Sequence, residues 1–437
     1  LNLTTGNLSG TGGINTVLAG NITLNVPLGN ISPAGTVTGN ILNVTAQNSS
    51  VLSTNVSSLR AKITGSGESL TVLETSDLLV YTGNVTTTSG NIVINIATGN
   101  LSGTGSINAV GGNISLNTIL GNITLNTSSN QIFGNVLAVT ALDNSSLKTQ
   151  VQGFESNVTS NGNSALTVVE ADDLTLWENG VVTNNSALSI TLLSGNLASG
   201  FIKDFTLVNG GVNYTSAPLV SITGGGGTGA TAVATIAGSS VNAVIVTNAG
   251  TGYTSIPTVK ISPDPLFPVG TGADFTANIV SGKINAGTGN ITLSAASGNV
   301  TLNGAISQIS GNILNLTAAN SSSLNTSVLS LVANITGALS GLVIQETNDL
   351  QIGTGNVVTT SGDITIQLAT GNLTGTGSVK APNANLSLNV SAGNITLNST
   401  ASQIVGNVLE VKAQNTSNLN TSISTLNASV TNSGDSF

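Results

Sequence analysis

Three Glu-x-x-Asp-Leu elements carry the carboxylates in this chain that could do chemistry. Their paired residues are Glu74/Asp77, Glu170/Asp173 and Glu346/Asp349. Paired carboxylates can ligate calcium or act as acid and base in glycoside hydrolysis. The copies are far apart along the chain, however, and no local pair is accompanied by Lys or Arg, or by a further carboxylate except Asp172. We therefore expect structural roles, with Asp in Asx turns and Glu at strand edges, and no catalytic residues.

The composition excludes several classes of function. The 437 residues include no Cys and no His, which removes zinc fingers, Fe–S clusters, ordinary haem ligation and Cys/His or Ser/His/Asp catalysis. Only 8 residues are Lys or Arg, too few for the basic surface that nucleic acid requires. The net charge is −9, and 39% of the residues are hydrophobic, which argues against disorder. We expect no cofactor, no metal and no nucleic-acid partner.

Two other stretches could suggest a ligand or a membrane. The glycine run Gly224–Gly227 is followed by neither a Lys nor a helical pattern, so we interpret it as a turn and not as a phosphate loop. The most apolar segment, Val328–Ile344, is interrupted by Ser, Asn, Thr and Gly residues. No membrane span is expected in this chain.

A long repeat organises the chain. The segment Gly-Asn-Ile-Leu-Asn-Val-Thr-Ala, or a close variant, begins at Gly39, Gly134, Gly311 and Gly406. These starts are 95, 177 and 95 residues apart, so the middle interval holds one 95-residue period and about 82 further residues. The pattern predicts superrepeats one and two in residues 1–200, an insertion in residues 201–286, and superrepeats three and four in residues 287–437.

Within each superrepeat a shorter motif, Gly-Asn-Ile-Thr-Leu-Asn, predicts the fold. Its Ile and Leu are two residues apart, the period of a strand with one buried face. The preceding Gly-Asn tolerates positive φ and marks a turn. Short strands and Gly-Asn corners predict an all-β chain, a right-handed parallel β-helix (β-solenoid) of roughly 20-residue coils. The alternative is an array of antiparallel sandwiches.

These motifs resemble a known family. The Gly-Asn-Ile-Thr-Leu coils and the element Gly-Asn-Val-Thr-Thr-x-Ser-Gly-Asn-Ile, at 83–92 and echoed at 355–364, look like filamentous-haemagglutinin-type proteins. The resemblance covers residues 1–200 and 287–437. It implies a long, repetitive, autotransporter-like bacterial surface protein built on a β-helix, with an extracellular or cell-surface location.

The insertion at 201–286 has a different composition and its own repeat. It holds 6 of the 11 aromatic residues and 5 of the 8 prolines. Residues 205–222 match residues 244–261, 39 positions later, which predicts two tandem β units of about 41 residues. They resemble the Gly-x-Gly-Tyr-Thr-Ser-x-Pro repeats of bacterial surface and phage structural proteins. Tyr214, Tyr253 and Phe267 are the candidate partner contacts, although the two tyrosines could instead build the core of the unit.

Asparagine is abundant at the predicted corners. More than two dozen Asn-x-Ser/Thr sequons occur, including those at Asn21, Asn122, Asn290 and Asn394. In a secreted protein sequons can carry glycans. Because these fall inside the repeated hexamer, we expect most of them to reflect composition, and their side chains to form amide ladders along the axis.

Both chain ends fall within a superrepeat. Leu1-Asn-Leu-Thr-Thr-Gly-Asn aligns with residues 94–100, and Phe437 precedes the position of the next Glu-x-x-Asp element. Open coils expose strand edges that invite stacking. The expectation is a window from a longer fibrous protein, or a subunit that associates end to end or laterally.

The sequence therefore predicts a non-enzymatic extracellular structural protein that self-assembles by solenoid stacking into a fibre, sheath or surface layer. One alternative is an adhesin whose insertion at 201–286 binds surface glycans or neighbouring cells. A polysaccharide-active β-helix is the other, and it would need at least three charged residues on one face.

Overall fold

The computed structural model describes residues 1–16, 20–127, 131–160, 162, 164–304, 308–399 and 403–436. Phe437, at the predicted open end, lies outside these residues. All of the regular secondary structure in the described ranges is β-strand. No described helix is long and apolar enough to cross a membrane.

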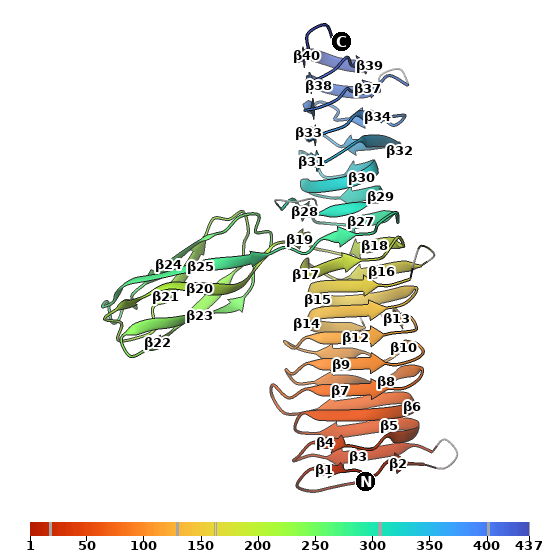
Figure 1. The fold of residues 1–437 in the computed structure, drawn as a ribbon, viewed down its shortest axis with the longest axis vertical. Coiled ribbons are helices and arrows are strands. Elements are labelled where there is room, and N and C mark those ends of the chain that lie inside the picture. Colours follow the sequence, from red (N-terminus) through yellow and green to blue (C-terminus); the bar gives the residue numbers. More distant parts are fainter. Residues whose placement is uncertain are drawn as a thin grey trace.

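The strands form a stack of parallel coils, called the shaft below, and an antiparallel unit that projects from its side, called the arm (Figure 1). Before the arm, the shaft strands are β1 (Leu8–Gly10), β2 (Ile14–Asn15), β3 (Ile22–Val26), β4 (Ile31–Pro33), β5 (Val37–Ala46), β6 (Ser50–Ile63), β7 (Leu70–Glu74), β8 (Leu78–Thr87), β9 (Ile92–Ile96), β10 (Leu101–Gly103), β11 (Ile107–Ala109), β12 (Ile114–Thr118), β13 (Ile123–Leu125), β14 (Ile132–Ala141), β15 (Ser145–Val158), β16 (Ala165–Glu170), β17 (Leu174–Val182), β18 (Ala187–Leu192) and β19 (Leu197–Ser199).

The arm contains β20 (Phe201–Val212), β21 (Leu219–Thr223), β22 (Thr231–Ala237), β23 (Ser240–Asn248), β24 (Thr258–Ser262) and β25 (Thr271–Val280). After the arm, the shaft strands are β26 (Ile284–Asn285), β27 (Ile291–Ala295), β28 (Val300–Leu302), β29 (Ile309–Ala318), β30 (Ser322–Ile335), β31 (Leu342–Glu346), β32 (Leu350–Thr359), β33 (Ile364–Leu368), β34 (Leu373–Gly375), β35 (Val379–Lys380), β36 (Leu386–Val390), β37 (Thr396–Leu397), β38 (Ile404–Ala413), β39 (Asn418–Leu419) and β40 (Thr421–Val430).

Parallel pairing between successive coils builds the shaft. Strand β9 pairs with β7 before it and with β12 after it, in an unbroken register that puts Ile92 between Leu70 and Ile114. All three side chains are buried. Alternate residues face inward, as in β3, so each strand places the aliphatic side chain of every second residue on its counterpart in the next coil. These columns form one hydrophobic core along the shaft.

The prediction of an all-β parallel β-solenoid is thus confirmed, and the antiparallel sandwich array is wrong for the shaft. The four copies of the Gly-Asn-Ile-Leu segment lie on the ten-residue strands β5, β14, β29 and β38. The ~95-residue superrepeat, and the division of the chain at 200/201 and 286/287, stay predictions from the sequence.

The shaft continues directly across the arm. Strands β17, β18 and β19 pair in parallel with β26, β27 and β28. Asn196 and Asn299, 103 residues apart in sequence, meet at a corner, where the Asn299 backbone N–H donates to Asn196 Oδ1 at 3.0 Å. The hydrogen-bonded stack therefore continues where the chain leaves for the arm and returns.

The two sequence repeats of the arm interlock and are not independent tandem units. The first repeat supplies β20, β21 and β22, and the second supplies β23, β24 and β25. The antiparallel pairs are β20–β25, β21–β24 and β22–β23, so each pair takes one strand from each repeat. The sequence match revealed two similar segments but not this mutual pairing.

Candidate functional site

The aspartates of the Glu-x-x-Asp elements head ladders of hydrogen bonds between coils. Asp77 Oδ1 accepts the backbone N–H of Asn100 at 2.7 Å, and Asn100 Oδ1 accepts that of Asn122 at 3.0 Å. The same arrangement starts from Asp173 and from Asp349. Corner ladders therefore occur, but their Asn–Asn steps here run from backbone N–H to side-chain oxygen and not between side-chain amides. The expected Asx turns are wrong, because each carboxylate bonds to the next coil.

The glutamates of these elements lie inside the shaft and not at a strand edge. Glu74, Glu170 and Glu346 are each at most 2% exposed. Glu170 accepts hydrogen bonds from the Thr149 hydroxyl at 2.8 Å and from the backbone N–H groups of Val151 and Ala171. The carboxyl group thereby binds the backbone of β15 between the part that pairs with β16 and the part that pairs with β17, which is a structural role.

Burial shifts the pKa of two of these carboxyls, those of Glu170 and Glu346. Desolvation raises the pKa of Glu170 to about 7, against the lowering effect of the hydrogen bonds from Thr149, Ala171 and Val151. Desolvation also raises the pKa of Glu346. No group of three or more carboxylates able to hold a metal ion occurs in the described ranges.

The predicted contact residues of the arm divide into buried and exposed side chains. Tyr214 is 2% exposed and Tyr253 3%, and both rings belong to the hydrophobic clusters of the arm. A Cβ on Gly270 would lie 2.4 Å from the Tyr214 ring, and one on Gly227 would lie 2.5 Å from that of Tyr253. Each tyrosine therefore packs on a glycine of the other repeat. Phe267, at 55% exposed, faces solvent.

The junction between shaft and arm gathers side chains that the sequence did not single out. Trp177 of β17 stacks on Phe201 of β20, with ring centroids 3.8 Å apart and planes inclined by 8°. The Thr175 hydroxyl donates to the Thr251 hydroxyl at 2.9 Å. These contacts fix the start of the arm against the shaft.

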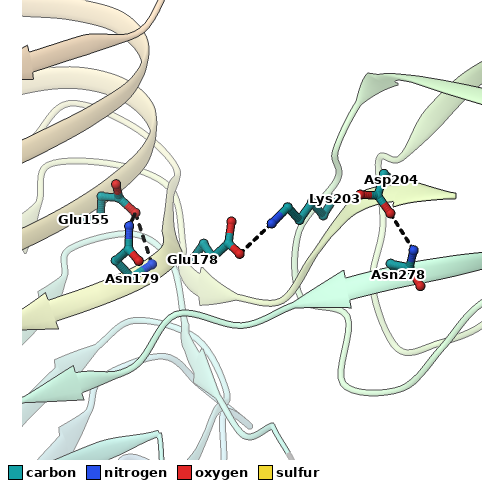
Figure 2. Close-up of polar contacts among 6 residues, drawn as sticks. All are labelled: Glu155, Glu178, Asn179, Lys203, Asp204 and Asn278. Carbon is teal, nitrogen blue, oxygen red and sulfur yellow. Dashed lines mark hydrogen bonds and ion pairs between the residues drawn. The ribbon is translucent and has the colours of Figure 1, made fainter.

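An ion pair spans the same junction. Figure 2 shows Lys203 of the arm directed toward Glu178 of the shaft, with Nζ and Oε1 2.6 Å apart. The hydrogen bond to Glu178 raises the pKa of Lys203. Nearby, Asn179 donates to Glu155, and Asn278 donates to Asp204. Both side chains of the pair are nearly half exposed, so the pair contributes little to stability.

A cleft of about 390 Å³ lies between the two walls of this junction. The shaft wall includes Asn135, Gln152 and Trp177, and the arm wall includes Ile202 and residues 246–250. Such a volume is in the range of sites for small ligands, roughly 300–1,000 Å³. The cleft is the candidate functional site.

One sequence signal could have located this site. Trp177 is the only tryptophan of the chain, and it stands seven residues after Glu170. The residues seven after the other two glutamates are Tyr81 and Gly353. Comparison of these positions identifies a residue particular to the part of the shaft that bears the arm.

The fold and site define a β-solenoid protein with a lateral antiparallel β unit. No protein-family model, no curated protein and no solved structure matches the chain. Its function must therefore be argued from its own residues.

Proposed function

We propose that the chain is a non-enzymatic extracellular structural protein, in which the shaft is a stiff rod and the arm a fixed lateral contact. The observation that supports this most is the single hydrophobic core, which includes buried residues from Ile22 to Ala413. Coils stacked in one direction by backbone hydrogen bonds and aliphatic columns resist bending, because bending separates paired strands.

The proposed location rests on surface chemistry and resemblance. Only 6% of the residues are charged, and Cys is absent, so Asn, Thr and Ser supply most of the polar surface. That chemistry is shared with the filamentous-haemagglutinin-type proteins that the coil motifs resemble. A fibre, sheath or surface layer is the assembly we propose, formed by end-to-end or lateral self-association.

Electron microscopy of the purified chain tests the rod. The shaft has about 18 turns, which at ~4.8 Å per turn gives a length of roughly 85 Å. Straight rods of this length with one lateral projection are expected. Particles that bend freely, or have no constant length, would contradict the proposal.

Location and assembly need separate measurements. An antibody against the arm should label intact source cells, whereas labelling only after lysis would refute a surface location. Sedimentation velocity over a wide concentration range should show association of the full chain. A chain that stays monomeric at every concentration would refute self-assembly. That result would not bear on the proposal that the shaft is a stiff rod.

The adhesin alternative has less support. Its candidate glycan contacts are Tyr214, Tyr253 and Phe267, and the two tyrosine rings are buried in the arm. Only Phe267 remains as a solvent-facing contact of that set.

A further inference from the structure

The junction cleft has polar groups on its shaft wall that the structure does not use. The Gln152 side chain is exposed and the Trp177 side chain is half-buried; no described residue bonds to the amide of the first or to the indole N–H of the second, so both are open to a ligand in the cleft. Asn135 donates through Nδ2 to Asn113 Oδ1 at 3.1 Å, which leaves its own Oδ1 as an acceptor. Neutral donors and acceptors therefore line one side of the cleft.

The charges at the cleft are already paired. Glu178 and Lys203 both line it, and they bond to each other across its walls. An ionic ligand would have to compete with this pair, whereas a neutral ligand leaves it intact. The apolar part of the lining comes from Trp177, Phe201 and Ile202. A ligand with both hydroxyls and carbon-bound hydrogens matches this mixture.

Gln152 is not explained by attachment of the arm. Trp177, Thr175 and Glu178 each contact an arm residue, so their side chains have a structural use. Gln152 lies in β15, seven residues after Ser145; the matching residues of β6 and β30, after Ser50 and Ser322, are Ser57 and Leu329. The long amide thus occurs beside the cleft, with no intramolecular partner in the described part of the chain.

We propose that the junction cleft binds one or two pyranose units of a neutral polysaccharide, with Gln152 and the Trp177 indole N–H donating to sugar hydroxyls. The cleft volume, the neutral polar groups and the paired charges carry this assignment. It goes beyond the structural role proposed above and does not depend on it. It also differs from a glycan site at Tyr214 and Tyr253, whose rings are buried.

Tryptophan fluorescence gives a direct test, because Trp177 is the only tryptophan. The full chain is titrated with cellobiose, maltose, lactose and N,N′-diacetylchitobiose, each to about 10 mM, ten times a weak dissociation constant of roughly 1 mM. At least one disaccharide should change the emission saturably. Gln152→Ala should weaken that binding about tenfold, as expected for loss of a hydrogen bond.

Ser57→Ala is the matched control, since Ser57 occupies the corresponding position in β6, away from the arm. It should leave sugar affinity unchanged. The unliganded emission spectrum of Gln152→Ala should equal that of the wild type, which shows that the arm is still docked. No saturable change with any of the four sugars, or equal binding by Gln152→Ala, would overturn the assignment. Neither result bears on the proposal that the shaft is a stiff rod, which electron microscopy tests separately.

Discussion

Ser156 places a hydroxyl in an otherwise aliphatic column of the shaft. It is 5% exposed, lies between Val139 and Val181, and its Oγ has no hydrogen-bond partner in the described structure. Ala61 and Ala333 occupy the same register position between aliphatic neighbours. We expect Ser156→Ala to stabilise the chain by about 1 kcal/mol, because it removes a buried unpaired polar group.

Denaturant unfolding measures this change in the free energy of unfolding. The reciprocal substitution Ala61→Ser is the control, and it should destabilise the chain by a similar amount. A less stable Ser156→Ala variant would mean that the hydroxyl has a partner in solution.

Glu170 should make stability depend on pH. Burial raises its pKa from 4.5 to about 7, so the folded chain holds the proton more tightly than the unfolded chain does. The stability that the protonated Glu170 carboxyl contributes is fully present below pH 4.5 and is lost as the pH rises through about 7. The loss is about 3 kcal/mol for a shift of this size.

The measurement compares the unfolding free energy of wild type and Glu170→Gln between pH 4 and pH 8. The amide of the variant cannot titrate. The difference in unfolding free energy between wild type and variant should therefore change by about 3 kcal/mol between pH 4 and pH 8. Parallel curves for the two proteins would show that the carboxyl keeps an ordinary pKa in the folded chain.

The corners that join strands tolerate side chains only where the neighbouring coil leaves room. Gly195 has φ +77°, and a Cβ there would lie 2.5 Å from the backbone nitrogen of Asp173. Gly67 has nearly the same φ, +75°, but no atom lies within 4 Å of its added Cβ. Gly67→Ala should therefore cost about 1 kcal/mol from the left-handed conformation alone.

For Gly195→Ala we expect a cost of about 3 kcal/mol or more, since the Cβ also pushes two coils apart. Thermal unfolding of the two variants separates the conformational cost from the packing cost. Equal melting temperatures would show that the corner at Gly195 relaxes to accept the Cβ. Close packing of the coils would then not restrict this position to glycine.

The parts of the fold that sequence revealed are those set by local pattern. Alternating Ile and Leu after Gly-Asn predicted the coils, because period two and positive φ act within a few residues. The burial of Glu170 was not predictable, since it depends on backbone amides of another strand, β15. The Trp177–Phe201 stack was not predicted either, because it joins two units whose relative placement has no local pattern.

At the scale of the whole molecule, the parallel pairing of the shaft passes directly from the coil before the arm to the coil after it. Three strand pairs join the shaft directly across the arm, and Phe201 and Val280 are antiparallel partners where the chain leaves and returns. Such partners have Cα atoms about 5 Å apart, so deleting residues 201–280 and joining 200 to 281 requires little movement. The shortened chain should fold, with its melting temperature within a few degrees of the wild type.

Deleting only the second arm repeat, residues 240–280, should have a different result. Strands β20, β21 and β22 would each lose their antiparallel partner, so the remaining half-arm should unfold and become sensitive to protease. Trp177 loses Phe201 outright when 201–280 are deleted, and unfolding of the half-arm should withdraw Phe201 from it when only 240–280 are deleted, so its emission should shift to longer wavelength in both variants. Circular dichroism, limited proteolysis and tryptophan emission distinguish these states. If the chain lacking 201–280 aggregates while the wild type is soluble, the shaft depends on the arm, because Phe201 and its neighbours then complete the shaft at the junction and do not merely dock there.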